Sequence, residues 1–333
     1  MSRHFIIALI AVLFTPSFSR ADLRDGGTFA ARDSLNCQPD GNADAAACIA
    51  GLKWPVAAFT VRCETAMPGG GDWLVRFPSP VPVGDAVNDL VAMEWHMARD
   101  KDGKPMKAPA IVIVHESGRG MVAGKVFAKG LRPYGFHTFL IHLPGYGART
   151  STLTNNPKLM LPALKQAIAD VRRARDAVAA LPFVDSTNIA LQGTSLGGFV
   201  TATVSGLDRG YDRIFILLAG GNIADVILTG TRDAAGLKRR LLESGITDDE
   251  IRASAKTIEP LRLAHRVDPK RVWLYTGKSD DVVPPACSRA FATAAKLGAE
   301  HHIELPVGHY SAAILMPLIL PRIHELMRGQ SNQ

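Results

Sequence analysis

Long apolar runs are almost absent from the sequence. The one near its start, Phe5–Phe14, follows a basic residue and precedes Pro16 and a small-x-small ending at Ser19 and Ala21. It falls well below the roughly 20 residues that cross a bilayer, so residues 1–21 are predicted to be a cleaved secretory signal, with a membrane anchor as the alternative. No later segment qualifies as a transmembrane helix. The mature protein is therefore expected to be periplasmic or secreted.

Cysteine is also scarce. The four cysteines are Cys37, Cys48, Cys63 and Cys287, and their spacing matches no zinc signature. In an oxidising compartment disulfides persist, and three pairings are possible among which the sequence does not choose. Cys37 with Cys48 is the easiest loop to close, and free thiols remain the alternative.

The sequence lacks a continuous cluster of basic residues. Its net charge is +7, and loss of residues 1–21 removes Arg3 and Arg20 and no acid, leaving +5. The basic residues of one predicted helix stand among acids and are interpreted as a solvated face; these charged residues are Arg172, Arg173, Arg175, Asp170 and Asp176. No nucleic-acid partner is expected. Nothing in the sequence supplies a metal site or a phosphate-binding loop.

What the sequence does contain is an alternation of strand-like and helix-like segments. With 333 residues, 47% of them hydrophobic, the chain can bury a substantial core. The pattern predicts an antiparallel start and then a mainly parallel sheet with helices on both faces, an α/β fold. The predicted strands cover 73–77, 90–97, 111–114, 136–142, 189–192, 213–218, 271–276 and 302–305, and the clearest helices cover 122–131 and 157–181.

Two further regions frame the main domain, which is expected at residues 71–330. Residues 22–70 have weak periodicity and are predicted to form an N-terminal extension. An oversized connection with a capping-box sequence at Thr247 is predicted to form a small helical lid, about residues 222–268. Some of its apolar residues should face a substrate; they are Ile227, Leu228, Leu237, Leu241, Leu242, Ile246 and Ile251.

The stretch IALQGTSLGGFV places one serine between glycines, after a predicted strand and before a helix. A serine at such a tight turn is held in a strained backbone, and small neighbours allow its hydroxyl to project above the sheet. The turn also aims the backbone amide of Leu196 toward the place where a tetrahedral oxyanion would form. In this context Ser195 is predicted to be a nucleophile, although a capped glycine-rich turn is the structural alternative.

A serine hydroxyl needs a base to take its proton and an acid to orient that base. Asp280 lies just beyond the strand 271–276, in GKSDDVVPP, and His309 follows the last predicted strand, in LPVGHYSAA. Ser, Asp, His is the chain order of the α/β-hydrolase triad. Asp281 is the alternative acid. The other histidines weighed for this role are interpreted as structural; they are His137, His142, His301 and His302.

Through GTSLGG, GKSDDVVPP and GHYS together, residues 73 to 328 resemble the α/β-hydrolase superfamily, most strongly its dienelactone-hydrolase-like and ester-cleaving members. The resemblance implies Ser195 as nucleophile, Asp280 as acid and His309 as base. It also implies that the amide of Ser117, in HESGRG, donates to the oxyanion beside Leu196. Glu116 departs from the glycine expected in that loop. The stretch 143–149, LPGYGAR, resembles a loop that lines the site.

These observations predict an exported serine hydrolase that cleaves a small-molecule carboxylic ester through an acyl-enzyme and needs no cofactor or metal. A catalytically silent binding protein of the same fold is the alternative from another class, and silent relatives usually lack a triad member. Peptidase, thioesterase, lactonase and acyltransferase chemistry would use the same residues. The sequence leaves the oligomeric state open.

Overall fold

The strands of this protein form one continuous sheet. The computed structural model describes residues 26–151, 156 and 159–329, so the predicted signal sequence lies outside the described residues. In the described part, ten strands lie in the order β1-β2-β3-β4-β6-β5-β7-β8-β9-β10. They are β1 Gly27–Arg32, β2 Ala58–Thr65, β3 Trp73–Pro78, β4 Leu90–His96, β5 Ala108–Val114, β6 His137–His142, β7 Val184–Thr194, β8 Arg213–Leu217, β9 Val272–Gly277 and β10 His302–Leu305.

The sheet changes from antiparallel to parallel at β6. β1 to β4 pair antiparallel in sequence order, and β4 pairs antiparallel with β6. From β6 through β5, β7, β8 and β9 to β10 every pair is parallel. The predicted antiparallel start and parallel body are therefore confirmed. β7 begins five residues earlier than predicted, at Val184, because the residues between Val184 and Ile189 are polar and mostly exposed or half-buried and so give no strand signal.

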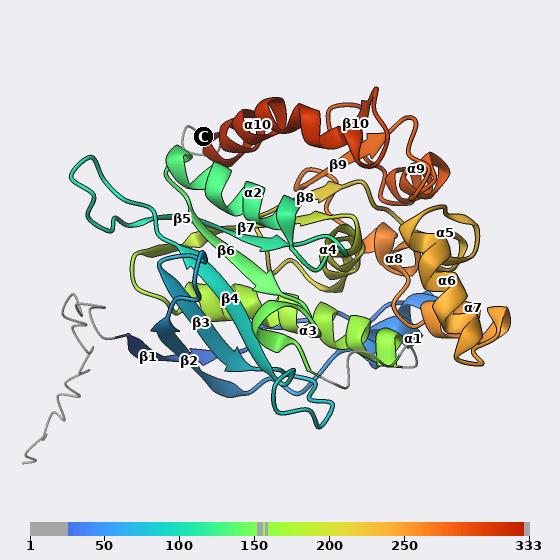
Figure 1. The fold of residues 1–333 in the computed structure, drawn as a ribbon, viewed down its shortest axis with the longest axis horizontal. Helices are drawn as coiled ribbons and strands as arrows, with labels where there is room; N and C mark the ends of the chain where they lie inside the picture. Colours follow the sequence, from blue (N-terminus) through green and yellow to red (C-terminus); the bar gives the residue numbers. More distant parts are fainter. Residues whose placement is uncertain (1–25, 152–155, 157–158, 330–333) are drawn as a thin grey trace, which may run out of the picture.

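Two layers of helices cover the sheet. Because successive side chains of a strand point to opposite faces, Ile111 and Ile113 of β5 pack with α2 and α10, while Val112 and Val114 pack with α3 and α4. Figure 1 shows these helices around the sheet. The helices are α1 Ala43–Leu52, α2 Val122–Leu131, α3 Met160–Ala179, α4 Leu196–Leu207, α5 Ile223–Thr229, α6 Asp233–Glu243, α7 Asp248–Ala255, α8 Pro260–Leu263, α9 Pro285–Ala294 and α10 Met316–Arg328. The predicted helix 122–131 is α2.

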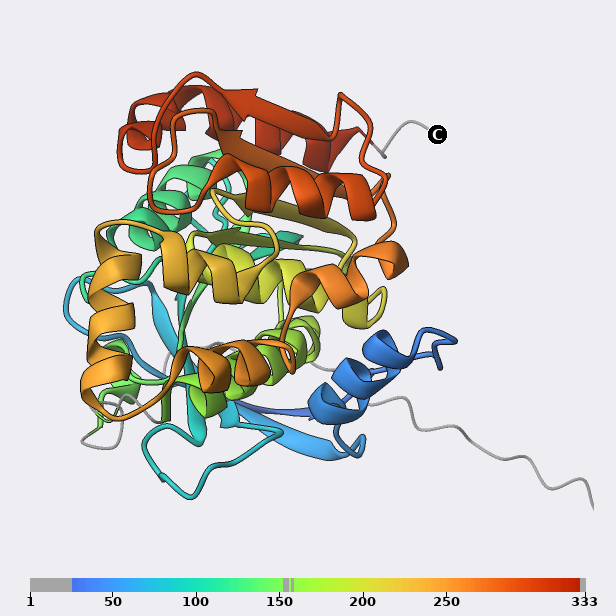
Figure 2. The ribbon, with the colours of Figure 1, turned by 90° about the vertical axis from the view of Figure 1, so that its right-hand side faces the viewer.

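The predicted lid segment, about 222–268, is helical and contains α5 to α8. α5, α6 and α7 stand together at one end of the molecule (orange in Figures 1 and 2). The capping box at Thr247 is present, since its hydroxyl accepts the amide of Glu250 and the Glu250 carboxylate accepts the amide of Thr247. At the far end of the segment Leu263 is fully buried in the main core. This end of the segment therefore packs in the core of the domain and is not part of a lid.

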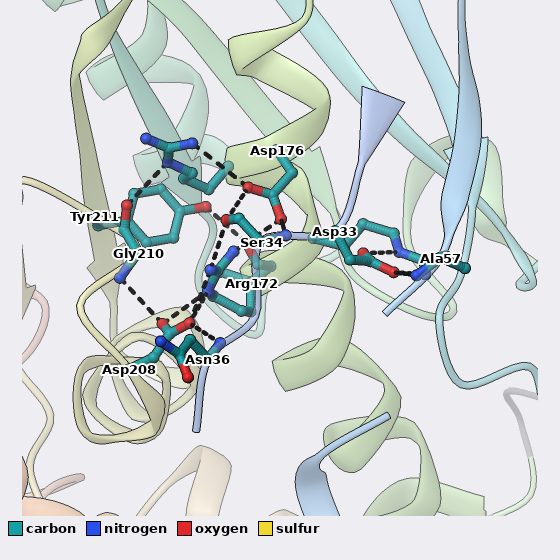
Figure 3. A network of polar contacts seen from close by, with 12 residues as sticks. Asp33, Ser34, Asn36, Ala57, Arg172, Asp176, Asp208, Gly210 and Tyr211 are labelled. Atoms are coloured by element: carbon teal, nitrogen blue, oxygen red, sulfur yellow. Dashed lines mark hydrogen bonds and ion pairs between the residues drawn. The ribbon is translucent and has the colours of Figure 1, made fainter. Parts of the chain in front are cut away.

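The interpretation of the basic residues on α3 as a solvated face is wrong. Arg172 and Arg173 are 1% and 5% exposed. The chain that follows β1 covers this side of the helix, where Arg173 pairs with Asp33. Arg172 pairs with Asp208 and donates to Ser34 (Figure 3). Both charges are buried in ion pairs: the N-terminal segment supplies the acid of Arg173, and the end of α4 supplies Asp208 for Arg172.

Residues 26–70, in the region predicted as an N-terminal extension, contribute β1, α1 and β2, and β1 and β2 lengthen the antiparallel side of the sheet. The cysteines of this region, Cys37, Cys48 and Cys63, and Cys287 of α9 are all free thiols in the structure. Burial raises the pKa of each thiol, to about 11 or 12. No helix among the described residues is long and apolar enough to cross a membrane.

Candidate active site

Ser195 lies at the turn between β7 and α4, as predicted. Its φ of 52° and ψ of −116° belong to a region that residues other than glycine rarely adopt. The turn is tight because α4 starts against the end of β5: a Cβ on Gly197 would collide with the carbonyl oxygens of Val114 and His115. Gly197 is therefore required for the helix to begin at this place.

The structure brings the three predicted triad residues together from three separate loops. His309 Nε2 lies 2.9 Å from Ser195 Oγ, and His309 Nδ1 lies 2.7 Å from Asp280 Oδ2. The other carboxylate oxygen of Asp280 accepts the amides of Val282 at 2.9 Å and Val283 at 2.8 Å. These bonds fix the carboxylate so that it can orient the imidazole.

Asp281, the alternative acid, lies elsewhere. Its side chain is 46% exposed and accepts a hydrogen bond from Arg232 Nε at 3.0 Å, which lowers the pKa of the carboxyl. Asp280, in contrast, is 6% exposed and faces His309. The geometry therefore places Asp280, and not Asp281, against His309.

The two candidate oxyanion donors lie near Ser195. The amide of Leu196 is at the first position of α4, where helix N–H groups have no partner within the helix. Ser117 lies on the loop after β5, and its carbonyl oxygen accepts the hydroxyl of Tyr146 at 2.9 Å. Ser117, Tyr146, Ser195 and Leu196 all line one cavity. Their placement fits the predicted roles of the two amides, which remain a proposal.

Glu116, the departure in this loop, has a structural function. Its two carboxylate oxygens accept the amides of Ala123 and Gly124, both at 3.2 Å, at the start of α2. Met121, the residue before that helix, offers no side-chain cap, so Glu116 supplies one from five residues upstream. The sequence signal for this contact was missed because capping residues usually stand next to the helix.

His115 is buried and holds the same loop. Its Nδ1 is 2.6 Å from the carbonyl oxygen of Glu116, and its Nε2 accepts the amide of Leu143 at 3.2 Å. An imidazole that accepts at Nε2 and donates at Nδ1 is neutral, and burial lowers the pKa of His115 to about 4. His115 thus connects the loop after β5 to the predicted site loop 143–149, of which Tyr146 lines the cavity.

The cavity over Ser195 has a volume of about 740 Å³. One wall comes from α3 and the loops after β5 and β6, and the opposite wall comes from α5 and α6. Of the apolar lid residues singled out in the sequence, Ile227 and Leu237 line the cavity, whereas Leu241 and Ile251 are buried in the core. Arg232 also lines the cavity and was missed, because its contacts join segments far apart in the chain.

The other histidines lie away from the triad. His137 accepts the amide of Ala98 at 3.0 Å, and His142 contacts Glu94 at 3.2 Å; both are buried. His301 and His302 contact β9, at the carbonyl of Val272 and the hydroxyl of Thr276. Among the described residues no group of three or more His, Cys, Asp or Glu could hold a metal ion.

The fold and this site define a serine hydrolase of the α/β-hydrolase fold. The model of the prolyl oligopeptidase family matches residues 130–309, more than half of the chain and the part from α2 to His309. The protein belongs to that family. Among curated proteins there is no match.

Solved structures share the fold at low identity. An acetyl xylan esterase from Paenibacillus sp. R4 is 14% identical, with a TM-score of 0.57, over 87% of this chain and 96% of that one. Acetyl xylan esterase 1 from Thermoanaerobacterium sp. JW/SL YS485 is 15% identical, with a TM-score of 0.54, over 89% and 87%. A puromycin-hydrolysing peptidase from Mycobacterium tuberculosis is 14% identical, with a TM-score of 0.55, over 83% of this chain and 46% of that one.

Proposed function

We propose that the protein cleaves a small carboxylic ester, with Ser195 as nucleophile, His309 as base and Asp280 as the acid that orients the base. The observation that carries the proposal is the hydrogen-bond chain from Asp280 through His309 to Ser195, which ends in a cavity of about 740 Å³. A cavity of this size suits a small-molecule substrate.

The residues of the site support each step of acyl transfer. Nε2 of His309 is within reach of the Ser195 proton, so it can take that proton as the oxygen attacks the ester carbonyl. The amides of Leu196 and Ser117 would stabilise the oxyanion, and the Asp280 carboxylate would stabilise the imidazolium. His309 then returns the proton to the leaving alcohol, and water releases the acyl group by the same sequence of steps.

A peptidase is the second candidate, and the family match favours it, since the family is named for an oligopeptidase. Both reactions use the same triad. The ester is preferred here because two similar folds are acetyl xylan esterases and because an alcohol leaves more readily than an amine. Matched p-nitrophenyl esters and p-nitroanilides with the same acyl groups distinguish the two. Because an activated phenyl ester reacts more readily than an anilide with either class of enzyme, efficient cleavage of the p-nitroanilides would by itself reject the ester proposal.

Variants of the triad test the residue roles. A fluorophosphonate probe should label the protein at Ser195, and Ser195→Ala should abolish labelling, because only an activated serine reacts readily with it. Asp280→Asn should lower kcat by about 10⁴-fold, the loss expected when an imidazole is left in the wrong tautomer. Asp281→Asn is the matched control and should change kcat on a p-nitrophenyl acetate substrate by less than about threefold. If Asp281→Asn lowered kcat more than Asp280→Asn, the acid of the triad would be Asp281.

We also propose that the protein is exported. The basic start, the short apolar run Phe5–Phe14 and the residues Ser19 and Ala21 support a signal sequence. N-terminal sequencing of the protein from cell fractions tests this proposal. A mature chain that starts near residue 22, in the periplasm or medium, is expected. Recovery of the uncut chain from the cytoplasm alone would reject it.

A further inference from the structure

The predicted lid contacts the loop that carries Asp280 and Asp281 at the connection between α5 and α6. A Cβ on Gly230 would lie 2.5 Å from the carbonyl oxygen of Val282, so no side chain fits there. Thr231 then donates from its amide at 3.0 Å and its hydroxyl at 2.7 Å to the carbonyl oxygen of Asp281. The connection is therefore fixed directly beside the residue that orients the imidazole, Asp280.

Arg232 extends this contact to the loop that carries His309. Its Nε donates to Asp281 Oδ2 at 3.0 Å, and its guanidinium carbon lies 5.3 Å from the centre of the Tyr310 ring. Tyr310 directly follows His309. Burial and a hydrogen bond with the Asp233 carboxylate raise the pKa of the Tyr310 phenol. One lid side chain thus touches the neighbour of the acid and the neighbour of the base.

The backbone of Arg232 is an independent indication of function. Its φ of 51° and ψ of −111° are close to the values at Ser195, 52° and −116°. Residues other than glycine persist in such conformations only where their surroundings fix them, and they concentrate at functional sites. Arg232 and Ser195 line the same cavity. The strained backbone of Arg232 therefore belongs to a residue of the cavity that Ser195 lines.

We propose that Arg232, Asp281 and Tyr310 form an anchor that holds the lid against the two triad loops and so determines which acyl groups enter the cavity. The proposal rests on the proposed function, because Ser195 must be the nucleophile that the lid covers. Arg232 and Asp281 act as positioning residues. The second aspartate of GKSDDVVPP is then a lid contact, whereas the first is the acid of the triad.

The anchor is weak enough to release. The side chains of Arg232 and Asp281 are 59% and 46% exposed, and exposed ion pairs are screened by salt and contribute little energy. Loss of this ion pair loosens the connection between α5 and α6, which the two bonds of Thr231 still hold at Asp281. High salt should therefore have the same effect on the lid as removal of either charge.

Charge-removing variants test the anchor. Arg232→Gln and Asp281→Asn are each expected to change the ratio of KM for long over short p-nitrophenyl esters by about two- to fivefold, the size of an exposed ion pair. They should also speed hydrogen exchange in residues 222–243. Because the two residues share one contact, the double variant should change the ratio no more than the larger single change. Arg239→Gln, which removes a charge from the exposed pair with Glu243 on the same helix, is the matched control.

Several outcomes would overturn the anchor. These are unchanged exchange and selectivity in both variants, effects that add in the double variant, and an equal effect of Arg239→Gln. In 1 M NaCl the wild type should resemble Arg232→Gln, and a persistent difference in exchange of residues 222–243 would count against an ionic contact. If no ester is cleaved at all, the proposed function fails. Hydrogen exchange and the rate of fluorophosphonate labelling of Ser195 then still decide whether the anchor exists.

Discussion

At the scale of single residues, polar side-chain contacts hold the loop that carries Ser117. Glu116 caps α2, and His115 bridges Glu116 and Leu143, so two side chains that precede Ser117 fix the loop that carries its amide. In a trans peptide the carbonyl of Glu116 and the N–H of Ser117 point in opposite directions. Fixing that carbonyl therefore fixes the direction of the candidate oxyanion donor.

His115 should make the stability of the protein depend on pH. Burial depresses its pKa to about 4 from the usual 6.5, so between these values the unfolded chain binds the proton and the folded chain does not. Stability is then complete above pH 6.5 and is lost as the pH falls toward 4, by about 3 kcal/mol. Urea unfolding measured between pH 7 and pH 4.5 should show this decline, and His115→Asn should reduce the slope. An equal slope in the variant would assign the decline to other groups.

At the scale of elements, α6 presents different faces to the cavity and to solvent. Leu237 lines the cavity, whereas Leu242 on the same helix is 44% exposed and lies outside it. The two positions therefore separate substrate contact from helix stability. They also allow a sharper experiment than replacement of residues 222–268, because Leu263 at the end of that segment belongs to the core.

Enlarging Leu237 should shorten the acyl chain that the enzyme accepts. Leu237→Trp fills part of the cavity, and contacts of methylene size change selectivity by about 10- to 200-fold. The ratio of kcat/KM for p-nitrophenyl octanoate over acetate should fall by at least about tenfold. Leu242→Trp, the matched control, should leave the ratio within about twofold. Equal ratios in the two variants would show that loops outside the lid set the chain length.

For the whole molecule, the N-terminal segment is part of the structural core of the domain. Arg172 on α3 pairs with Asp208 at the end of α4 and with Asp176, and it donates to Ser34 of the segment (Figure 3). Ser34 in turn donates to Asp176 from its amide and its hydroxyl. This network connects the antiparallel side of the sheet to the helices that carry the site.

Breaking this network should destabilise the whole molecule. Arg172→Met leaves the buried carboxylate of Asp208 without a cation and Asp176 with only its 3.5 Å contact to Arg175, and the loss of one partner from a buried pair costs about 3–5 kcal/mol. The free energy of unfolding in urea should fall by that amount at pH 7. Arg239→Met removes an exposed cation and should change it by less than about 0.5 kcal/mol. A similar small change for Arg172→Met would show that the network is not important for stability.

The sequence by itself determined the fold class, the succession of strands from β3 onward and the candidate triad. These features depend on local patterns: β-branched runs for buried strands, apolar spacing for α2 and α3, and the small residues around Ser195 that allow a tight turn. Asp280 and His309 could be predicted because the carboxyl ends of parallel strands meet at one edge of the sheet. Their positions after β9 and β10 therefore implied that they lie near the serine.

Only the tertiary structure decided which charges are buried and what the lid contacts. Arg172 and Arg173 have the local pattern of a solvated helix, and they are buried because the N-terminal residues Ser34 and Asp33, about 140 residues away, fold over them. Arg232 and Asp281 stand 49 residues apart and their contact leaves no periodic signal. Local sequence records backbone preference and the apolar face of an element, whereas the partner of a polar side chain depends on which segments the completed fold brings together.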